Sequence, residues 1–258
     1  MLKRHTHGLI ILSCFVLLLT VAYLILMPNL SRLKKENPEK TALMEYREKA
    51  FKEKSRTYRM DQRWTAYSKI SPYLIKAVLI SEDDKFWQHE GFDYEAIQKA
   101  VQKDLKAKRF KSGGSTITQQ LARNLFLSPE KSLIRKLSEA LITWRMEKVL
   151  SKKRILELYL NVAEWGEGIF GAEAASRHYF GKPSSELTPE EAARLAAILP
   201  NPRKYSPVGN QRYVVNRSNV IYGVMIRRGI VIPESKEENE RDDSFPSTPL
   251  NPAQGIEP

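Results

Sequence analysis

The chain has 258 residues, of which 42% are hydrophobic, and its 42 basic residues outnumber its 30 acidic ones. This length allows one or two domains with a sizeable core, and a mean hydropathy of −0.44 excludes a polytopic membrane protein. The single cysteine excludes an intramolecular disulfide and a cysteine-based metal centre.

The first predicted element is a membrane span over residues 8–27, a run of 20 residues without a charge. Such a run is long enough to cross a hydrocarbon core of about 30 Å. The alternative is a cleaved signal peptide, but the run is too long for a typical signal core and no A-x-A-like cleavage site follows. We therefore expect residues 1–27 to form a short N-terminus and an uncleaved anchor.

Three further regions follow the anchor. Residues 28–59 are polar with mixed charges, and we interpret them as a stalk. Residues 60–232 carry the apolar periodicity of a folded body. Residues 233–258 contain five prolines, seven acids and two bases, so this tail has a net charge of −5 and we expect it to be disordered. The rest of the chain then carries +17, which favours an anionic partner such as nucleic acid, a phosphorylated ligand or a membrane surface.

The body is predicted to be mainly α-helical, with few strand signals. Ser71 and Pro72 indicate a helix start, and the apolar spacing that follows extends through Glu82 to Phe86. Further helices are predicted after Gly113-Gly114, over 154–161 and from Thr188, and around an apolar stripe of Leu133, Leu137, Ala140, Leu141 and Trp144.

Glu82 is the most informative single residue, because it lies on the apolar face of its predicted helix and is followed by Asp83 and Asp84. Burial and neighbouring carboxylates favour the protonated form of a carboxyl group, which suits a general acid or base. The alternative is a glutamate at a helix end that points back to solvent.

The segment from Ser112 to Gln120 is a glycine turn that leads into a helix, with Thr116 and Gln119 at capping-box spacing. Free N–H groups at a helix start favour an anion, although an ordinary capped helix would give the same pattern. Glu139 lies about 160° from the apolar stripe of its own helix, where a solvated i,i+4 pair with Arg135 is the alternative to a functional role.

Two other patterns are set aside. Gly166, Gly168 and Gly171 match a dinucleotide fingerprint, but the segment before them looks helical and the fingerprint requires a strand there. Ser128 and Lys131 match S-x-x-K without the companion motifs of a penicillin site. The four histidines show no metal-ligand spacing.

Five ordered blocks together resemble the family 51 peptidoglycan glycosyltransferases of the monofunctional biosynthetic type. They cover most of the body, and they are residues 82–93 (EDDKFWQHEGFD), 113–127 (GGSTITQQLARNLFL), 135–140 (RKLSEA), 151–171 (SKKRILELYLNVAEWGEGIFG) and 190–202 (EEAARLAAILPNP). The resemblance implies a mainly helical, lysozyme-like fold with a large lobe and a small membrane-facing lobe. It also implies an extracytoplasmic catalytic domain, over 60–232, on a single-pass anchor in the cytoplasmic (inner) membrane.

The implied activity is polymerisation of lipid II into β-1,4-linked glycan, with inversion at the donor carbon and release of undecaprenyl diphosphate. By resemblance, Glu82 is the catalytic base and Glu139 the second essential carboxylate, near the diphosphate. The negative charge of Glu139 beside a diphosphate would be offset either by a divalent cation, Mg²⁺ or Mn²⁺, bound at Glu139 or by neighbouring cationic side chains. The expected substrate-binding residues are Asp83, Ser115, Thr116, Gln119, Gln120, Arg123, Asn124, Arg135 and Lys136.

The resemblance also implies moenomycin as an inhibitor and no transpeptidase activity, since the chain ends too early for such a domain. The expected partners are lipid II, the growing glycan strand and membrane lipids, with other cell-wall synthesis or division proteins as further candidates and no nucleic acid. Two rival functions remain open: a lysozyme-like hydrolase or lytic transglycosylase, and a non-catalytic membrane-anchored scaffold.

Overall fold

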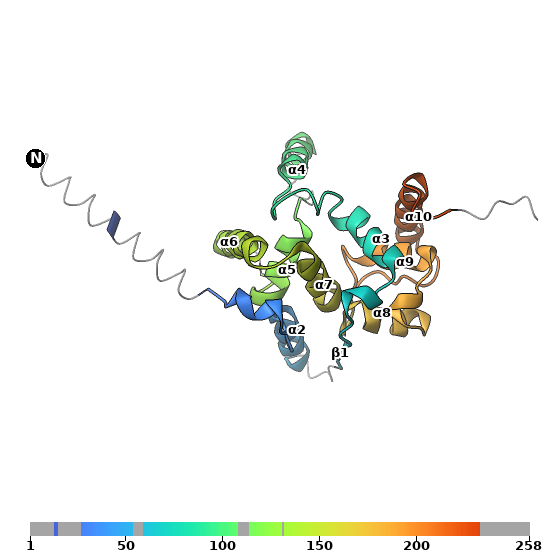
Figure 1. The fold of residues 1–258 in the computed structure, drawn as a ribbon, viewed down its shortest axis with the longest axis horizontal. Coiled ribbons are helices and arrows are strands. Elements are labelled where there is room, and N and C mark those ends of the chain that lie inside the picture. The colour runs from blue at the N-terminus through green and yellow to red at the C-terminus, as the bar shows by residue number, and fades with distance from the viewer. Residues whose placement is uncertain (1–12, 15–26, 54–58, 108–113, 131, 233–258) are drawn as a thin grey trace, which may run out of the picture.

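The structure is a computed structural model that describes residues 13–14, 27–53, 59–107, 114–130 and 132–232, with the side chains of 104–107 left aside. Within these ranges the fold is mainly α-helical, which confirms that part of the predicted fold class (Figure 1). The expected anchor over 8–27 lies almost wholly outside the described residues, as does the tail. No helix in the described part is both long and apolar enough to cross a bilayer.

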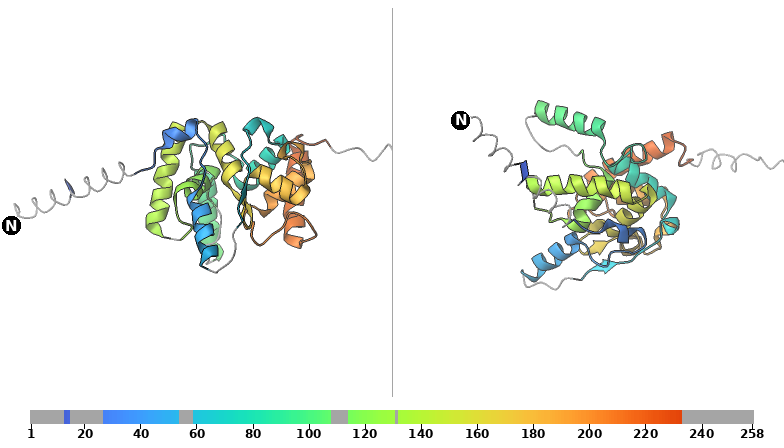
Figure 2. Two further views of the ribbon diagram at one scale, coloured as in Figure 1. Left: turned by 90° about the horizontal axis from the view of Figure 1, so that it is seen from below. Right: turned by 60° about the vertical axis from the view of Figure 1, so that its left-hand side comes forward.

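One group of helices packs around helix α3, which bears Glu82, and includes helices from the C-terminal part of the chain. Helix α3 (Pro72–Glu82) packs against α9 (Pro189–Ile198) and α10 (Arg212–Arg227). Their shared core is aliphatic, with Leu74 and Val78 of α3 fully buried. Helix α8 (Ala172–Phe180) lies beside this group, as the two views of Figure 2 show.

A second group is built around α5 (Ile117–Phe126), which packs against α6 (Leu133–Val149) and α7 (Lys152–Val162). Helix α7 is buried along most of its length, so it is the centre of the fold. Helix α4 (Tyr94–Ala107) lies clear of the other helices in Figures 1 and 2.

A small sheet joins the start of the body to its centre. Strand β3 (Ile169–Phe170) lies between β1 (Asp61–Gln62), to which it is parallel, and β2 (Glu164–Gly166), to which it is antiparallel. The segment before β2 is helix α7, so the glycines at 166, 168 and 171 belong to a hairpin and a following helix. This arrangement lacks the strand that a dinucleotide fingerprint needs before its glycines.

The described part of the expected stalk folds onto the body. Leu30 and Leu33 of a 3-10 helix, η1 (Leu30–Lys34), are buried in the main core. Arg154 of α7 donates to the carbonyls of Leu33 and Glu36, each at 2.8 Å. Helix α2 (Ala42–Lys52) then packs against α5, so the folded unit begins well before residue 60.

Two helix starts confirm the local sequence signals. Thr116 and Gln119 form a complete capping box at α5, and Thr188 and Glu191 form another at α9, where Pro189 is the first helical residue. The start at Ser71 differs in detail, because its hydroxyl donates to the carbonyl of Leu187 instead of capping α3.

The apolar stripe of α6 does not face the core. This stripe is largely exposed, with Leu133 86% and Leu137 68% accessible, whereas Glu139 is 1% accessible. The helix packs its opposite side, including Ile142 and Met146, on the core. Helix α3 is also shorter than predicted, because Asp83 leaves the helical conformation and Phe86 is buried from the turn that follows. The remaining 3-10 helices are η2 (Tyr67–Lys69) and η3 (Ser184–Glu186).

Candidate active site

Glu82 is the last residue of α3 and lines a cavity of about 200 Å³. Its side chain is 11% exposed. One carboxylate oxygen accepts a hydrogen bond from the Ser81 hydroxyl at 3.1 Å, and the other accepts from the Gln120 amide at 3.1 Å. Arg217 Nη2 of α10 lies 3.7 Å from the first oxygen. These donors hold the Glu82 carboxylate in a fixed orientation at the edge of the cavity, where a bound hydroxyl could reach it.

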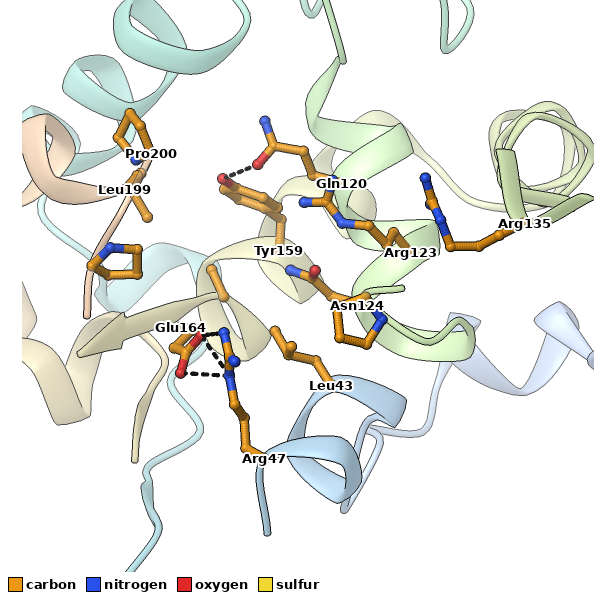
Figure 3. A pocket seen from close by; sticks show the side chains of 13 residues that line it. Leu43, Arg47, Gln120, Arg123, Asn124, Arg135, Tyr159, Glu164, Leu199 and Pro200 are labelled. Carbon is orange, nitrogen blue, oxygen red and sulfur yellow. Dashed lines mark hydrogen bonds and ion pairs between the residues drawn. The ribbon is translucent and has the colours of Figure 1, made fainter. Parts of the chain in front are cut away.

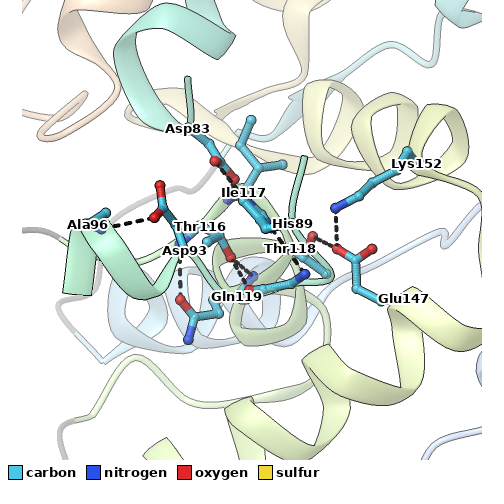
Figure 4. Close-up of polar contacts among 11 residues, drawn as sticks. Asp83, His89, Asp93, Ala96, Thr116, Ile117, Thr118, Gln119, Glu147 and Lys152 are labelled. Carbon is cyan, nitrogen blue, oxygen red and sulfur yellow. Dashed lines mark hydrogen bonds and ion pairs between the residues drawn. The ribbon is translucent and has the colours of Figure 1, made fainter. Parts of the chain in front are cut away.

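The two acids that follow Glu82 have partners of their own. Asp83 accepts from the backbone N–H of Ile117 at 2.9 Å and from His89 Nε2 at 2.8 Å, and it is 7% exposed (Figure 4). His89 Nδ1 accepts from a backbone N–H, which assigns the ring proton to Nε2. Asp84 pairs with Arg228 through bonds of 2.6 and 2.8 Å. The Arg228 hydrogen bond lowers the pKa of Asp84, so neither neighbour presents an unpaired charge to Glu82.

The start of α5 does bind an anion, but that anion is a side chain of the protein. The carboxylate of Asp83 lies on the first N–H of the helix, where the glycine-turn pattern predicted a ligand. Thr116 donates its hydroxyl to the carbonyl of Gly91 at 2.7 Å, and its own N–H is taken by the Gln119 side chain. The bonds of Asp83, Thr116 and Gln119 therefore fix the start of α5 (Figure 4). Asp83 and Thr116 line the same cavity as Glu82.

A second cavity, of about 280 Å³, lies between α2, α5, α6, α7, β2 and residues 199–202 (Figure 3). Three arginines line it, namely Arg47, Arg123 and Arg135, together with the single carboxylate of Glu164. Asn124 adds an amide to the wall. This concentration of guanidinium groups suits a multiply charged oxyanion such as a phosphate or diphosphate.

Gln120 connects the two cavities. Its amide nitrogen donates to Glu82 in the first, and its amide oxygen accepts from the Tyr159 hydroxyl at 3.0 Å in the second. Burial, with a further contribution from the charge of Glu82, raises the pKa of Tyr159 well above its ordinary value. Tyr159 therefore stays protonated and donates, which orients the Gln120 nitrogen toward Glu82.

Glu139 lies beneath the second cavity and does not line it. Its two oxygens accept from Arg135, at 2.5 Å, and from Lys136. Arg135 lines the cavity, whereas Lys136 is about half exposed beside it. The i,i+4 pair predicted with Arg135 is present, but it is buried on the carboxylate side, so Glu139 orients one cation of the cavity wall, Arg135.

The residues around Glu139 do not fit a divalent ion held by the protein. Mg²⁺ takes free oxygen ligands, and both oxygens of Glu139 already accept from cationic side chains. Within the described ranges, no group of three or more His, Cys, Asp or Glu residues is placed to hold a metal. No step of the reaction is therefore assigned to a metal. The arginines account for the positive charge of the cavity.

The structure divides the predicted site residues between these places. The first cavity is lined by Glu82, Asp83, Ser115 and Thr116, the second by Gln120, Arg123, Asn124 and Arg135, and neither of the two by Gln119, Lys136 and Glu139. Sequence reasoning missed Arg47, Tyr159, Glu164 and Arg217. Tyr159 and Glu164 fall in one of the five sequence blocks that carry the family resemblance. Arg47 and Arg217 lie outside all five blocks, and nothing in the sequence marked them.

Comparisons with known proteins agree with this arrangement. Residues 48–226 match the transglycosylase family. The chain is 50% identical over 194 residues to a protein of Nitrosospira multiformis, covering 75% of this chain and 84% of that one. It is 56% identical over 169 residues to one of Azoarcus sp. (66% and 73%), and 42% identical over 220 residues to one of Janthinobacterium sp. (85% and 94%). All three are named biosynthetic peptidoglycan transglycosylase, so the chain belongs to the transglycosylase family, in its biosynthetic peptidoglycan group.

Proposed function

We propose that this protein polymerises lipid II, a disaccharide-pentapeptide carried on undecaprenyl diphosphate, into β-1,4-linked glycan. The observation that carries the proposal is the hydrogen-bonded Gln120 amide, which joins a poised carboxylate in one cavity to an arginine-lined cavity next to it. A glycosyl transfer with a diphosphate leaving group needs both features: a base for the acceptor and cations for the leaving group.

In the proposed reaction the acceptor sugar binds beside Glu82 and the lipid-linked donor extends into the arginine cavity. Glu82 takes the proton of the acceptor 4-hydroxyl as that oxygen forms a bond to the donor anomeric carbon. The bond from this carbon to the diphosphate breaks on the opposite face, so the α-linked donor becomes a β-linked product. The Ser81 and Gln120 donors fix the orientation of the Glu82 carboxylate before the reaction begins.

The leaving diphosphate carries its charge into the second cavity. Arg123 and Arg135 line that cavity, and a guanidinium binds phosphate oxygens through two parallel N–H groups. Glu139 fixes Arg135 in place and lies behind it, away from the ligand. A hydrolase of the lysozyme type has no leaving diphosphate, so such a cavity would serve no purpose in it.

Incubation of the full chain with labelled lipid II in detergent tests the proposal, with the products separated by glycan electrophoresis. We expect long glycan that a muramidase digests, and none from Glu82→Gln. Failure to extend lipid II would refute polymerisation, and shortening of preformed glycan strands would point to the hydrolase. By the same resemblance, moenomycin stops the reaction and penicillin forms no covalent adduct with the chain.

The enzyme is proposed to work at a membrane surface, with residues 8–27 as its anchor and residue 28 onward outside the cytoplasm. The exposed stripe on α6 supports contact with lipid, because Leu133, Ile134, Leu137 and Trp144 are each more than half accessible. Exposed apolar side chains in one row indicate a surface that another apolar phase covers. Peptidoglycan synthesis itself places such an enzyme at the cell envelope.

A fluorescent label tests the lipid contact. The only cysteine is Cys14, so Leu137→Cys in a Cys14→Ser background carries a single environment-sensitive label. We expect its emission to shift to the blue when the chain is reconstituted in vesicles, while a label at Val220, 66% exposed on α10, stays in water. Equal emission from both positions would refute contact through α6.

A further inference from the structure

Arg47 lies in the wall of the arginine cavity although it comes before the family match at residue 48 and before every sequence block that carries the resemblance. It belongs to α2, in the segment that the sequence suggested was a stalk. Its Nε and Nη2 donate to both oxygens of Glu164, with the shortest bond 2.7 Å (Figure 3). The two residues are 117 positions apart in the chain.

The chemistry of Glu164 explains why this pair matters to the cavity. Glu164 is the one carboxylate among the lining residues, and its side chain is only 7% exposed. Without a counter-ion it would place a poorly solvated negative charge in the wall of a cavity built for anions. With Arg47 present, three arginines and one glutamate give the lining a formal charge of +2.

Helix α2 has other attachments, so the Arg47–Glu164 pair is not what keeps it on the body. Leu43 and Met44 pack with Phe170 of β3 in a separate buried cluster. Thr41 caps the helix by accepting from the Met44 N–H. Removing the Arg47 charge therefore alters the electrostatics of the cavity while these apolar contacts still hold the wall.

We propose that Arg47 is a positioning residue of the diphosphate cavity, which cancels the charge of Glu164 and makes the segment before residue 48 part of the donor site. The inference rests on the proposed function, because it assigns the cavity to the lipid diphosphate. It predicts that affinity follows the net charge of the lining. That charge is +1 for Arg47→Gln, +2 for the wild type and the double variant Arg47→Gln/Glu164→Gln, and +3 for Glu164→Gln.

The experiment measures binding of undecaprenyl diphosphate in detergent to the full-length chain and these three variants. We expect Arg47→Gln to bind at least about tenfold more weakly than the wild type and Glu164→Gln to bind more tightly. The double variant should lie between the two single variants. Arg47→Lys keeps the charge and should recover most of the affinity. In lipid II turnover, Arg47→Gln should raise KM with kcat changed less than about threefold.

A purely structural role for the pair makes a different prediction. Each single variant breaks the same bonds, so both would weaken binding to a similar extent, and that result would overturn the inference. Arg177→Gln is the matched control, since it breaks a 2.7 Å pair with Glu173 on α8 that lines neither cavity. Thermal unfolding of each variant shows whether it is folded.

The binding measurement also separates this inference from the proposed function. If the wild type binds the diphosphate but makes no glycan from lipid II, polymerisation is refuted and the order of the variants still decides the role of Arg47. If the wild type makes glycan and Arg47→Gln binds the diphosphate as tightly as the wild type does, only the role of Arg47 is refuted. A wild type that makes glycan without binding the diphosphate refutes the role of Arg47 and leaves polymerisation standing.

Discussion

Replacing Glu82 by glutamine removes one proton acceptor and leaves the shape of the site. The amide oxygen of the new side chain can still accept from Gln120, as the carboxylate does at 3.1 Å. Loss of a general base lowers the rate by about 10²–10⁴-fold, which is about 3–5.5 kcal/mol of transition-state stabilisation. We expect that loss in kcat for lipid II, measured by glycan electrophoresis against time. A rate above about a tenth of the wild type would refute the assignment of the base.

The same substitution should leave the protein folded. The Arg217 contact is long, 3.7 Å, and Arg217 is about one third exposed, so losing it costs about 0–1 kcal/mol. That change lowers Tm by less than about 4 °C in a domain of this size. Glu90→Gln is the matched control, because Glu90 is an exposed carboxylate that pairs with Lys148 and lines neither cavity, and it should polymerise lipid II within about threefold of the wild type.

Three further results are expected. Glu139→Gln frees the two cations that its carboxylate orients, so binding of undecaprenyl diphosphate should weaken by about tenfold or more and the free energy of unfolding should fall by about 2 kcal/mol; unchanged binding would contradict its role. Gly171→Ala should lower Tm more than Gly209→Ala, because both glycines have a φ of +87° but only at 171 would the new Cβ meet a carbonyl oxygen, at 2.7 Å. Because its hydrogen bond to Arg228 lowers the pKa of Asp84 from 3.8, that pair stabilises the fold above pH 3.8 and loses its contribution as the pH falls further. Asp84→Asn should remove this part of the acid dependence of Tm, and an identical pH profile would contradict the pairing.

Local signals were enough to predict several elements. The capping boxes at α5 and α9 are each formed within four residues of the chain, so the same atoms that the pattern names make the hydrogen bonds. The helical character of α7 and the rejection of the dinucleotide fingerprint also followed from nearby residues. The apolar spacing around Glu82 predicted a carboxylate on the buried side of its helix, and the side chain is 11% exposed.

The buried face of α6 could not be predicted from its own sequence. Periodicity identifies an apolar row but does not say what covers it. In α6 the apolar row faces outward, and the side with Glu139 and Thr143 packs on the core. Burial of Glu139 is possible because Arg135 and Lys136, on the adjoining positions, provide both of its counter-ions. In a protein proposed to work at a membrane, an apolar row of a helix can face lipid, so it need not be the row that packs on the core.

The surroundings of Glu82 differ from those that its sequence neighbours indicated. Asp83 and Asp84 were expected to act on Glu82 as neighbouring negative charges. Instead, Asp83 accepts a hydrogen bond from the N-terminus of α5, and Asp84 pairs with Arg228 at the end of α10. Both partners are distant in sequence, 34 and 144 positions away. What surrounds Glu82 instead is a set of donors, Ser81 and Gln120, with Arg217 further off. Two donors therefore orient the Glu82 carboxylate in its cavity, and each neighbouring acid is engaged elsewhere, which supports the proposed role of Glu82 as the base that takes the acceptor proton.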